Sequence, residues 1–296
     1  MTERRILPTL PDSIPTSTLT RADELVRRTA FLAGLVAPET TACFRELLKV
    51  ANAHYSRVID GKPAEPEMLE REFVLEHHQS AFGHISELRR RIVVVLCQHY
   101  QLLHERTPRK AKGAFVRALT IEHFAQFGLQ PHLWSLPRGL GRRLDDYQSA
   151  TGMTDLMQTD ALESDQQPIG ASQFAFIDFM LDVCHEEVDY VTTALNRRRL
   201  RESVTRAYET NSRLKESGIR PETMPSLLAL LIQGALPRSE FVTFTGLTYE
   251  AANDQLNLLI HLGVVVSPPS NPQRLEVGLP AWFAQELLPD FYLALA

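Results

Sequence analysis

The chain has 296 residues, of which 44% are hydrophobic and 23% charged, as in an ordinary soluble globular protein. Its formal net charge of −5 argues against a general affinity for nucleic acid or for anionic membranes. The N-terminus lacks the apolar segment of a signal peptide, and the longest apolar run, Ile92 to Cys97, is far shorter than the roughly 20 residues of a membrane span. We therefore expect a cytoplasmic protein that makes no membrane contact.

Cys43, Cys97 and Cys184 are far apart and form neither a CxxC pair nor a cluster with histidines at metal-ligand spacing. We expect reduced thiols and no metal held by cysteine.

Residues 1–20 contain three prolines and little helical periodicity, so they predict an extended N-terminal arm. From Arg21 the spacing of apolar residues predicts successive helices. The expected helical ranges are 21–33, 40–59, 67–104 as one or two helices, 113–127, 140–150 and 171–195. Residues 151–170 are polar and predict a loop, and the highly charged stretch 197–216 predicts a solvated helical connector.

The pattern changes after residue 220. Apolar segments at 224–234, 239–245 and 248–262 predict three helices, and residues 264–267 and 274–279 predict a β-hairpin. Three helices followed by a hairpin is a winged-helix order. The predicted fold is therefore mainly α, with a small α+β module at residues 221–296.

The segment Leu133–Arg142, which reads LWSLPRGLGR, resembles the stretch that follows the catalytic helix in many bacterial Fic proteins. The helix expected from Phe174 to Tyr190 and the C-terminal module resemble the same family. The resemblance implies a Fido-like helical domain over residues 21–220, followed by a winged-helix domain over 221–296.

In that family the catalytic motif H-P-F-x-D/E-G-N-G-R-x-x-R precedes the LWS stretch. Counting back from Leu133 without a gap places the motif at residues 106–117. Gly113 and Arg117 match the family's second glycine and last arginine. Arg106 stands where the family has its histidine, and Lys110 where it has its acidic residue.

The resemblance implies a reaction in which AMP is transferred from ATP to a hydroxyl of a target protein. Both replacements affect this reaction. The histidine accepts the hydroxyl proton, whereas an arginine stays protonated and cannot. The acidic residue holds Mg²⁺, which a lysine repels. We therefore expect a catalytically impaired pseudoenzyme that does not hold Mg²⁺ at the motif. The alternative is a divergent nucleotidyltransferase that uses His104 or Glu105 as its base.

The rewritten loop is strongly basic. It brings five cationic side chains and a glycine to a place where the family binds phosphate: Arg106, Arg109, Lys110, Lys112, Gly113 and Arg117. One interpretation is a solvated basic loop. The other is an anion-binding site at a helix N-terminus, for ATP, another nucleotide or another polyanion.

An upstream segment, within the helix at about residues 42–61, resembles the family's inhibitory motif (S/T)xxxE(G/N). Ser56, Asp60 and Gly61 occupy the matching positions, with Asp in place of Glu. The resemblance implies that the Asp60 carboxylate pairs with Arg117 and obstructs the nucleotide. A helix ended by a glycine is the alternative interpretation.

Two other interpretations are less favoured. One of them is a metal-binding or catalytic role for His77, His78 and His84, although the surrounding sequence has the periodicity of a packed helix. A winged-helix transcriptional regulator is possible in principle, but the helix expected from Thr248 to His261 contains no Lys or Arg for DNA phosphates. A protein partner or target is better supported, and the sequence is compatible with a homo-oligomer.

Overall fold

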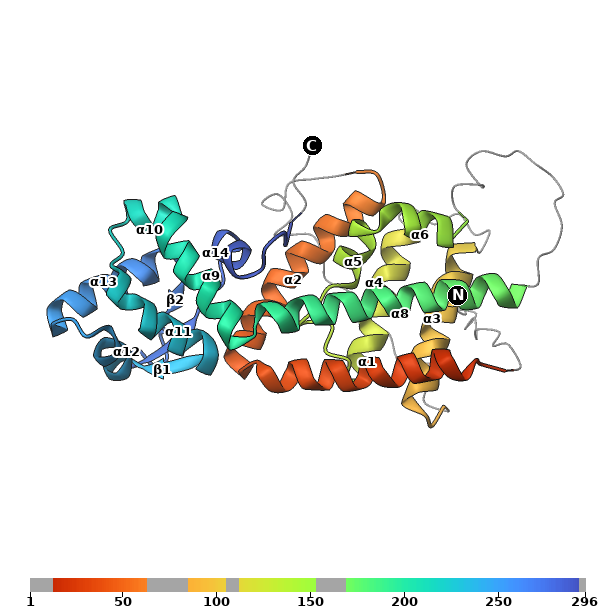
Figure 1. The fold of residues 1–296 in the computed structure, drawn as a ribbon, viewed down its shortest axis with the longest axis horizontal. Helices are drawn as coiled ribbons and strands as arrows, with labels where there is room; N and C mark the ends of the chain where they lie inside the picture. Colours follow the sequence, from red (N-terminus) through yellow and green to blue (C-terminus); the bar gives the residue numbers. More distant parts are fainter. Residues whose placement is uncertain (1–12, 63–84, 105–111, 153–168, 293–296) are drawn as a thin grey trace. The chain divides into compact units, whose positions relative to one another are not determined.

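The computed structural model of the chain describes residues 13–62, 85–104, 112–152 and 169–292 (Figure 1). The mainly helical fold predicted from the sequence is confirmed, with one small sheet near the C-terminus. None of the helices in this described part is long and apolar enough to cross a membrane.

The chain separates into two compact units. The first comprises Met1–Phe31 and Lys49–Asp189, and the second comprises Leu32–Leu48 and Tyr190–Ala296. Residues 190–220 therefore cluster with the C-terminal unit, and the domain boundary at residue 221 stays a prediction.

Seven helices account for most of the described chain before residue 195. They are α1 (Thr16–Leu35), α2 (Pro38–Ile59), α3 (Leu88–His104), α4 (Lys112–Gln126), α5 (Leu136–Arg142), α6 (Leu144–Ala150) and α8 (Ile169–Ala194). The first helix begins at Thr16, so residues 16–20 are not the extended arm that was expected. The helix expected over 140–150 is interrupted at Arg143, whose ψ of 42° is not helical.

Within the first unit, α1 and α8 run side by side and parallel (Figure 1). The Thr18 hydroxyl donates to Asp178 at 3.0 Å near the start of the pair, and Arg28 pairs with Asp189 further along both helices. Between these two contacts Arg21 pairs with Asp182. The matched order of the three contacts fixes the register of the helix pair.

The second unit consists of short elements around one sheet. Its elements are α9 (Arg197–Thr210), α10 (Ser212–Glu216), the 3-10 helix η2 (Pro221–Thr223), α11 (Met224–Gln233), β1 (Ala235–Pro237), α12 (Arg238–Thr245), α13 (Tyr249–His261), β2 (Val265–Val266), β3 (Arg274–Val277) and α14 (Ala281–Leu287). The strand order is β1-β3-β2, and both pairings are antiparallel.

The β2–β3 hairpin was predicted, but β1 was not. This strand is only three residues long and ends in Pro237, which lacks the N–H of a ladder donor. Its pairing with β3, Ala235 opposite Glu276, depends on a partner distant in the sequence. Local patterning carries no signal for such a strand.

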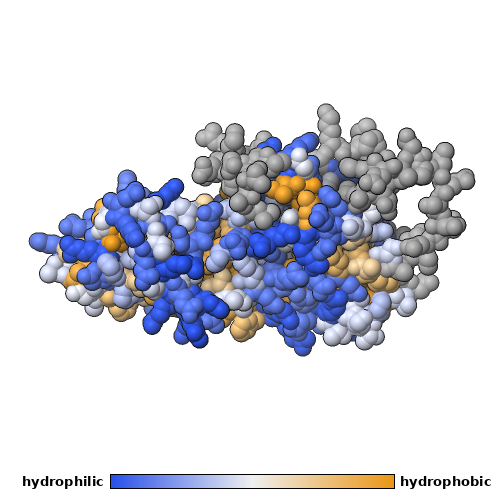
Figure 2. Space-filling model, turned by 45° about the horizontal axis from the view of Figure 1, so that its top comes forward, coloured by the Kyte–Doolittle hydropathy of each residue, from blue (hydrophilic) through white to orange (hydrophobic). Residues whose placement is uncertain are grey.

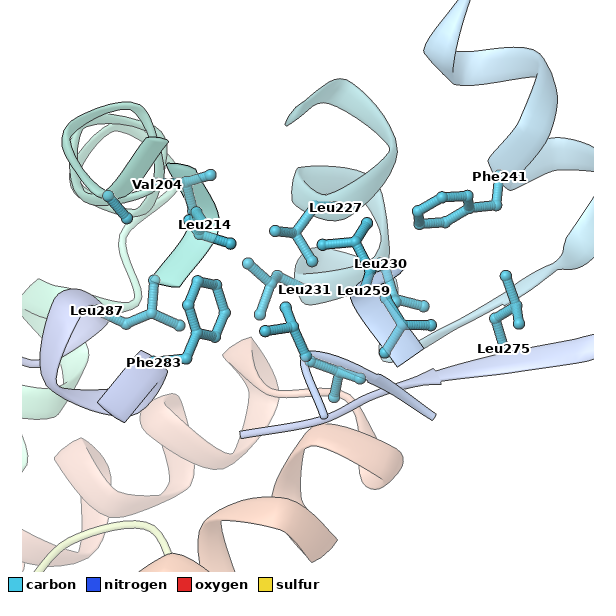
Figure 3. Close-up of a cluster of buried hydrophobic side chains, with 14 of the residues drawn as sticks. Val204, Leu214, Leu227, Leu230, Leu231, Phe241, Leu259, Leu275, Phe283 and Leu287 are labelled. Atoms are coloured by element: carbon cyan, nitrogen blue, oxygen red, sulfur yellow. The ribbon is translucent and has the colours of Figure 1, made fainter. Parts of the chain in front are cut away.

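One continuous apolar core fills the second unit (Figure 3). Leu227, Leu230 and Leu231 of α11 lie at its centre, and Phe283 of α14 points toward Leu214. The core also takes in Leu200, Val204, Ala207 and Tyr208 of α9. The expectation of a solvated connector at 197–216 is therefore wrong, because one face of this charged helix is buried.

Most of the visible face in Figure 2 is hydrophilic, and its apolar residues form small separate spots. Among the large hydrophobic side chains that are exposed in the second unit are Phe244 and Tyr249.

Candidate functional site: a buried arginine at the start of α4

The candidate site is built around Arg117, which lies in α4 and is 1% exposed. Its guanidinium Nη2 donates to Asp60 Oδ1 at 2.7 Å and to the Ser56 carbonyl at 2.9 Å. Its Nε donates to Ser56 Oγ at 3.3 Å. A guanidinium buried without such partners would destabilise the fold by several kcal/mol, roughly, so these contacts explain how α4 tolerates it.

The end of α2 provides these partners because of its local sequence. Ser56 and Asp60 are four residues apart and therefore lie on one face of the helix. The Asp60 N–H donates to the Ser56 carbonyl at 3.1 Å and completes the last turn. Gly61 then ends the helix at a φ of +68°, a left-handed conformation that glycine adopts without strain. The implied contact between Asp60 and Arg117 is present, and its inhibitory role stays a prediction.

Gly113, in the first turn of α4, leaves room for this ion pair. A Cβ at Gly113 would lie 3.0 Å from Arg117 Nη1 and 3.1 Å from Asp60 Oδ1. Any larger side chain would therefore press on both partners. Nζ of the neighbouring Lys112 donates a hydrogen bond to the Leu103 carbonyl at 2.9 Å. This bond links the start of α4 to the end of α3.

A buried polar chain supports Arg117 from the side of α3 and α6. His99 places Nδ1 2.8 Å from Thr120 Oγ1 and Nε2 3.0 Å from the Tyr147 hydroxyl. The charge of Arg117 also acts on Tyr147, where it favours the ionised hydroxyl. Burial, together with repulsion by Arg117, lowers the pKa of His99 to about 3, so its imidazole is neutral at physiological pH. Burial raises the pKa of Tyr147 to about 12.

His99, Thr120 and Tyr147 were not predicted from the sequence as site residues. His99 and Thr120 are polar residues within helices whose neighbours are buried and apolar. A polar residue on an apolar helical face is a signal that could have revealed them, because buried polar groups need partners. Their pairing with Tyr147 of α6 was not available from local sequence.

The LWS stretch positions α5 beside this site. Trp134 is fully buried, and its Nε1 donates to the Leu129 carbonyl at 2.8 Å. Ser135 caps α5 by accepting from the Arg138 N–H at 3.0 Å, and its hydroxyl donates to Asn52 of α2 at 2.6 Å. A Cβ at Gly141 would lie 2.7 Å from the Tyr55 ring. These residues therefore hold α5 tightly against the helix that carries Ser56 and Asp60.

Arg138 of α5 and Glu187 of α8 form a second buried ion pair in this unit. Arg138 Nη1 lies 2.6 Å from Glu187 Oε1, with side chains 3% and 5% exposed. Glu187 Oε2 is buried without a hydrogen-bond partner. Arg138 attracts the charged carboxylate, but burial has the larger effect and raises the pKa of Glu187 to about 7.

Of the remaining predicted site residues, His104 alone lies in the described part of the chain. Glu105, Arg106, Arg109 and Lys110 lie outside the described residues, as do His77, His78 and His84. His104 is exposed at the end of α3, where its Nδ1 is 2.8 Å from the Tyr100 carbonyl.

No group of three metal-ligating side chains occurs in the described ranges. Cys97 and Cys184 are buried free thiols, and Cys43 is half-buried. Burial raises the pKa of all three thiols, and that of Cys97 to about 11, so none is a reactive thiolate.

No protein-family model matches the sequence, and no curated protein matches it significantly. Among solved structures, the chain is similar to a Fic family protein from Desulfovibrio desulfuricans G20, with 15% identity and a TM-score of 0.37 over 92% of this chain and 99% of that one. A likeness of this degree does not define the arrangement or the chemistry of the site.

Proposed function

We propose that the chain is a Fic-like pseudoenzyme that binds a nucleotide or another phosphate-bearing ligand at the start of α4 and acts through binding. The observation that carries the proposal is the Asp60–Arg117 pair, 2.7 Å long, in which both residues occupy motif positions of the resemblance. The replaced residues Arg106 and Lys110 support loss of AMP transfer, because they remove the base and the Mg²⁺ ligand.

Arg117 is occupied in this arrangement. Asp60 and the two oxygens of Ser56 take its hydrogen bonds, so a phosphate reaches the guanidinium by displacing Asp60. The Asp60 side chain is 31% exposed, which makes it the most accessible part of the pair. We infer that Asp60 restrains anion binding at Arg117.

We further propose that residues 221–296 form a winged-helix module that contacts protein. The order α11-β1-α12-α13-β2-β3 supports this assignment. Helix α13 contains Glu250 and Asp254 but no Lys or Arg, which favours a protein contact over DNA recognition.

The nucleotide proposal is tested by calorimetric titration of ATP with and without Mg²⁺. We expect the Asp60→Ala variant to bind about tenfold or more tightly than the unmodified protein, because the charge that competes with phosphate is removed. Asp146→Ala is the matched control, since Asp146 is an exposed carboxylate paired with Arg143 at 3.0 Å. It should leave affinity unchanged, as should omission of Mg²⁺.

The double variant Asp60→Ala/Arg117→Gln separates the site from general electrostatics. This double variant should lose the gain in ATP affinity that Asp60→Ala produces, because the guanidinium that binds phosphate is absent. Failure of every variant to bind ATP or inorganic phosphate contradicts the proposal. Mg²⁺-dependent transfer of label from α-³²P-ATP to a protein would instead identify a nucleotidyltransferase.

A further inference from the structure

Opposite charges are separated along the second unit. Residues 197–220, which include α9 and α10, contain eight Arg and Lys against three acidic residues. Residues 221–292 contain two basic residues against seven acidic ones. This single compact unit therefore offers a basic and an acidic surface.

The basic surface centres on a row of arginines on α9. Arg197 and Arg201 are one turn apart, both exposed, on a helix whose buried side contributes Leu200 and Val204 to the core. Neither arginine forms a salt bridge within the described residues. Positive charge in a first helical turn is also opposed by the helix dipole, which a nearby acidic partner would offset.

The acidic surface contains a row of carboxylates with the same spacing as the arginines. Glu250 and Asp254 are one turn apart on α13 and exposed, while Ala252 and Leu256 of that helix are buried. As far as the structure is described, these two carboxylates have no salt-bridge partner either. Tyr249 lies beside them with 73% of its surface exposed and offers a ring face to a guanidinium.

The two rows are complementary in charge and in length. Four residues of helix rise about 6 Å, so each arginine of one row can face one carboxylate of the other. We infer that α9 of one copy docks on α13 of a second copy, with Arg197 and Arg201 opposite Glu250 and Asp254. A two-fold dimer repeats this contact twice, because each copy contains both α9 and α13 (Figure 1).

A second copy fits this basic row better than a nucleic acid does. Phosphate backbones are held by basic side chains spread over an interface, and the rest of this unit carries an excess of acidic residues. These acidic residues would repel a DNA duplex bound to α9. In a dimer, by contrast, they form the contact with the second copy. The inference does not depend on nucleotide binding at Arg117.

Charge-reversal variants of the full chain test the inference, with self-association measured by sedimentation velocity. We expect the unmodified protein to dimerise at about 0.05 M salt and to dissociate at about 1 M, where screening is strong. Arg197→Glu/Arg201→Glu and Glu250→Arg/Asp254→Arg should each weaken self-association about tenfold or more, because like charges then face one another. An equimolar mixture of the two variants should restore the dimer, since each supplies the row that the other needs.

Arg27→Glu/Arg90→Glu is the control, because it changes the net charge equally at exposed positions of the first unit. It should leave the dimer intact. A monomer at every salt concentration overturns the inference, and so does a mixture that fails to restore association when circular dichroism shows both variants folded. Binding of a labelled DNA duplex to Arg197 and Arg201, without self-association, would assign the row to a polyanion and reject the second copy.

Discussion

Buried polar side chains near α4 and α5 are tolerated because neighbouring residues are small. Gly113 leaves space for the Asp60–Arg117 pair, and Gly139 allows α5 to approach Val183 and Glu187. At both positions the glycine is needed for close approach, since neither has a positive φ. The contribution of these glycines is therefore steric and can be measured by adding one methyl group.

We predict that Gly139→Ala lowers the free energy of unfolding by about 1–3 kcal/mol. A Cβ there would lie 2.6 Å from Val183 Cγ1 and 2.8 Å from Glu187 Cγ, so α5 or α8 must move. Gly34→Ala is the matched control, because its Cβ would meet nothing within 4 Å. That control should be neutral or slightly stabilising in urea denaturation. Equal effects of the two substitutions would contradict the steric explanation.

We predict that Glu187 makes stability depend on pH. Its pKa is raised to about 7 by burial, so the folded protein holds a proton that the unfolded chain, near 4.5, has released. The free energy of unfolding should therefore fall as pH rises from about 4.5 to about 7, with a slope of up to about 1.4 kcal/mol per pH unit.

Substitution of Glu187 isolates this contribution. Glu187→Gln should flatten the slope in urea titrations across that range, whatever its effect on absolute stability. Asp146→Asn, at a carboxylate whose side chain is 59% exposed, should leave the slope unchanged. A slope that survives Glu187→Gln would show that another group is responsible.

At the scale of elements, helices were predictable where apolar residues recur at helical spacing and a glycine or proline ends the pattern. Helix α13, with Thr248 as its cap, is an example. The helical break at Arg143 was missed, and so was strand β1, which depends on pairing with a distant segment. The resemblance predicted the contact between Asp60 and Arg117, but the sequence could not supply the burial of Arg117 or the hydrogen bond between His99 and Tyr147.

Helix α9 shows how composition can mislead about packing. Its many arginines suggested a solvated connector, yet Leu200 is 3% exposed within the core of the second unit. Leu200→Ala should therefore cost about 2–5 kcal/mol of unfolding free energy, measured by chemical denaturation. Arg201→Ala, at the exposed neighbouring position, should change it by no more than about 0.5 kcal/mol. Similar small effects of both substitutions would restore the connector interpretation.

At the scale of the whole molecule, the second unit is assembled from two separate stretches of chain. Residues 32–48 belong to it, and three contacts show how they are held. The Cys43 thiol donates to the Val277 carbonyl at 3.0 Å, and Arg274 pairs with Glu39. Gly234, at a φ of +79°, lies so close to Ala37 that a Cβ would come within 2.6 Å of it. The C-terminal sequence alone is therefore an incomplete unit.

Three fragments test this organisation by thermal unfolding and near-ultraviolet circular dichroism. A fragment of residues 221–296 lacks Leu200, Val204, Ala207, Tyr208 and Leu214, each buried in the shared core. Since burying one such side chain contributes about 1.5–3 kcal/mol, this fragment should lack fixed tertiary structure. A fragment of residues 190–296 should be more ordered, and a peptide of residues 32–48 added in trans should raise its midpoint with the logarithm of peptide concentration. A scrambled peptide of the same composition is the control. Equal stability of the 221–296 and 190–296 fragments would show that the winged-helix segment folds without α9, and the boundary would then lie where the sequence pattern first placed it.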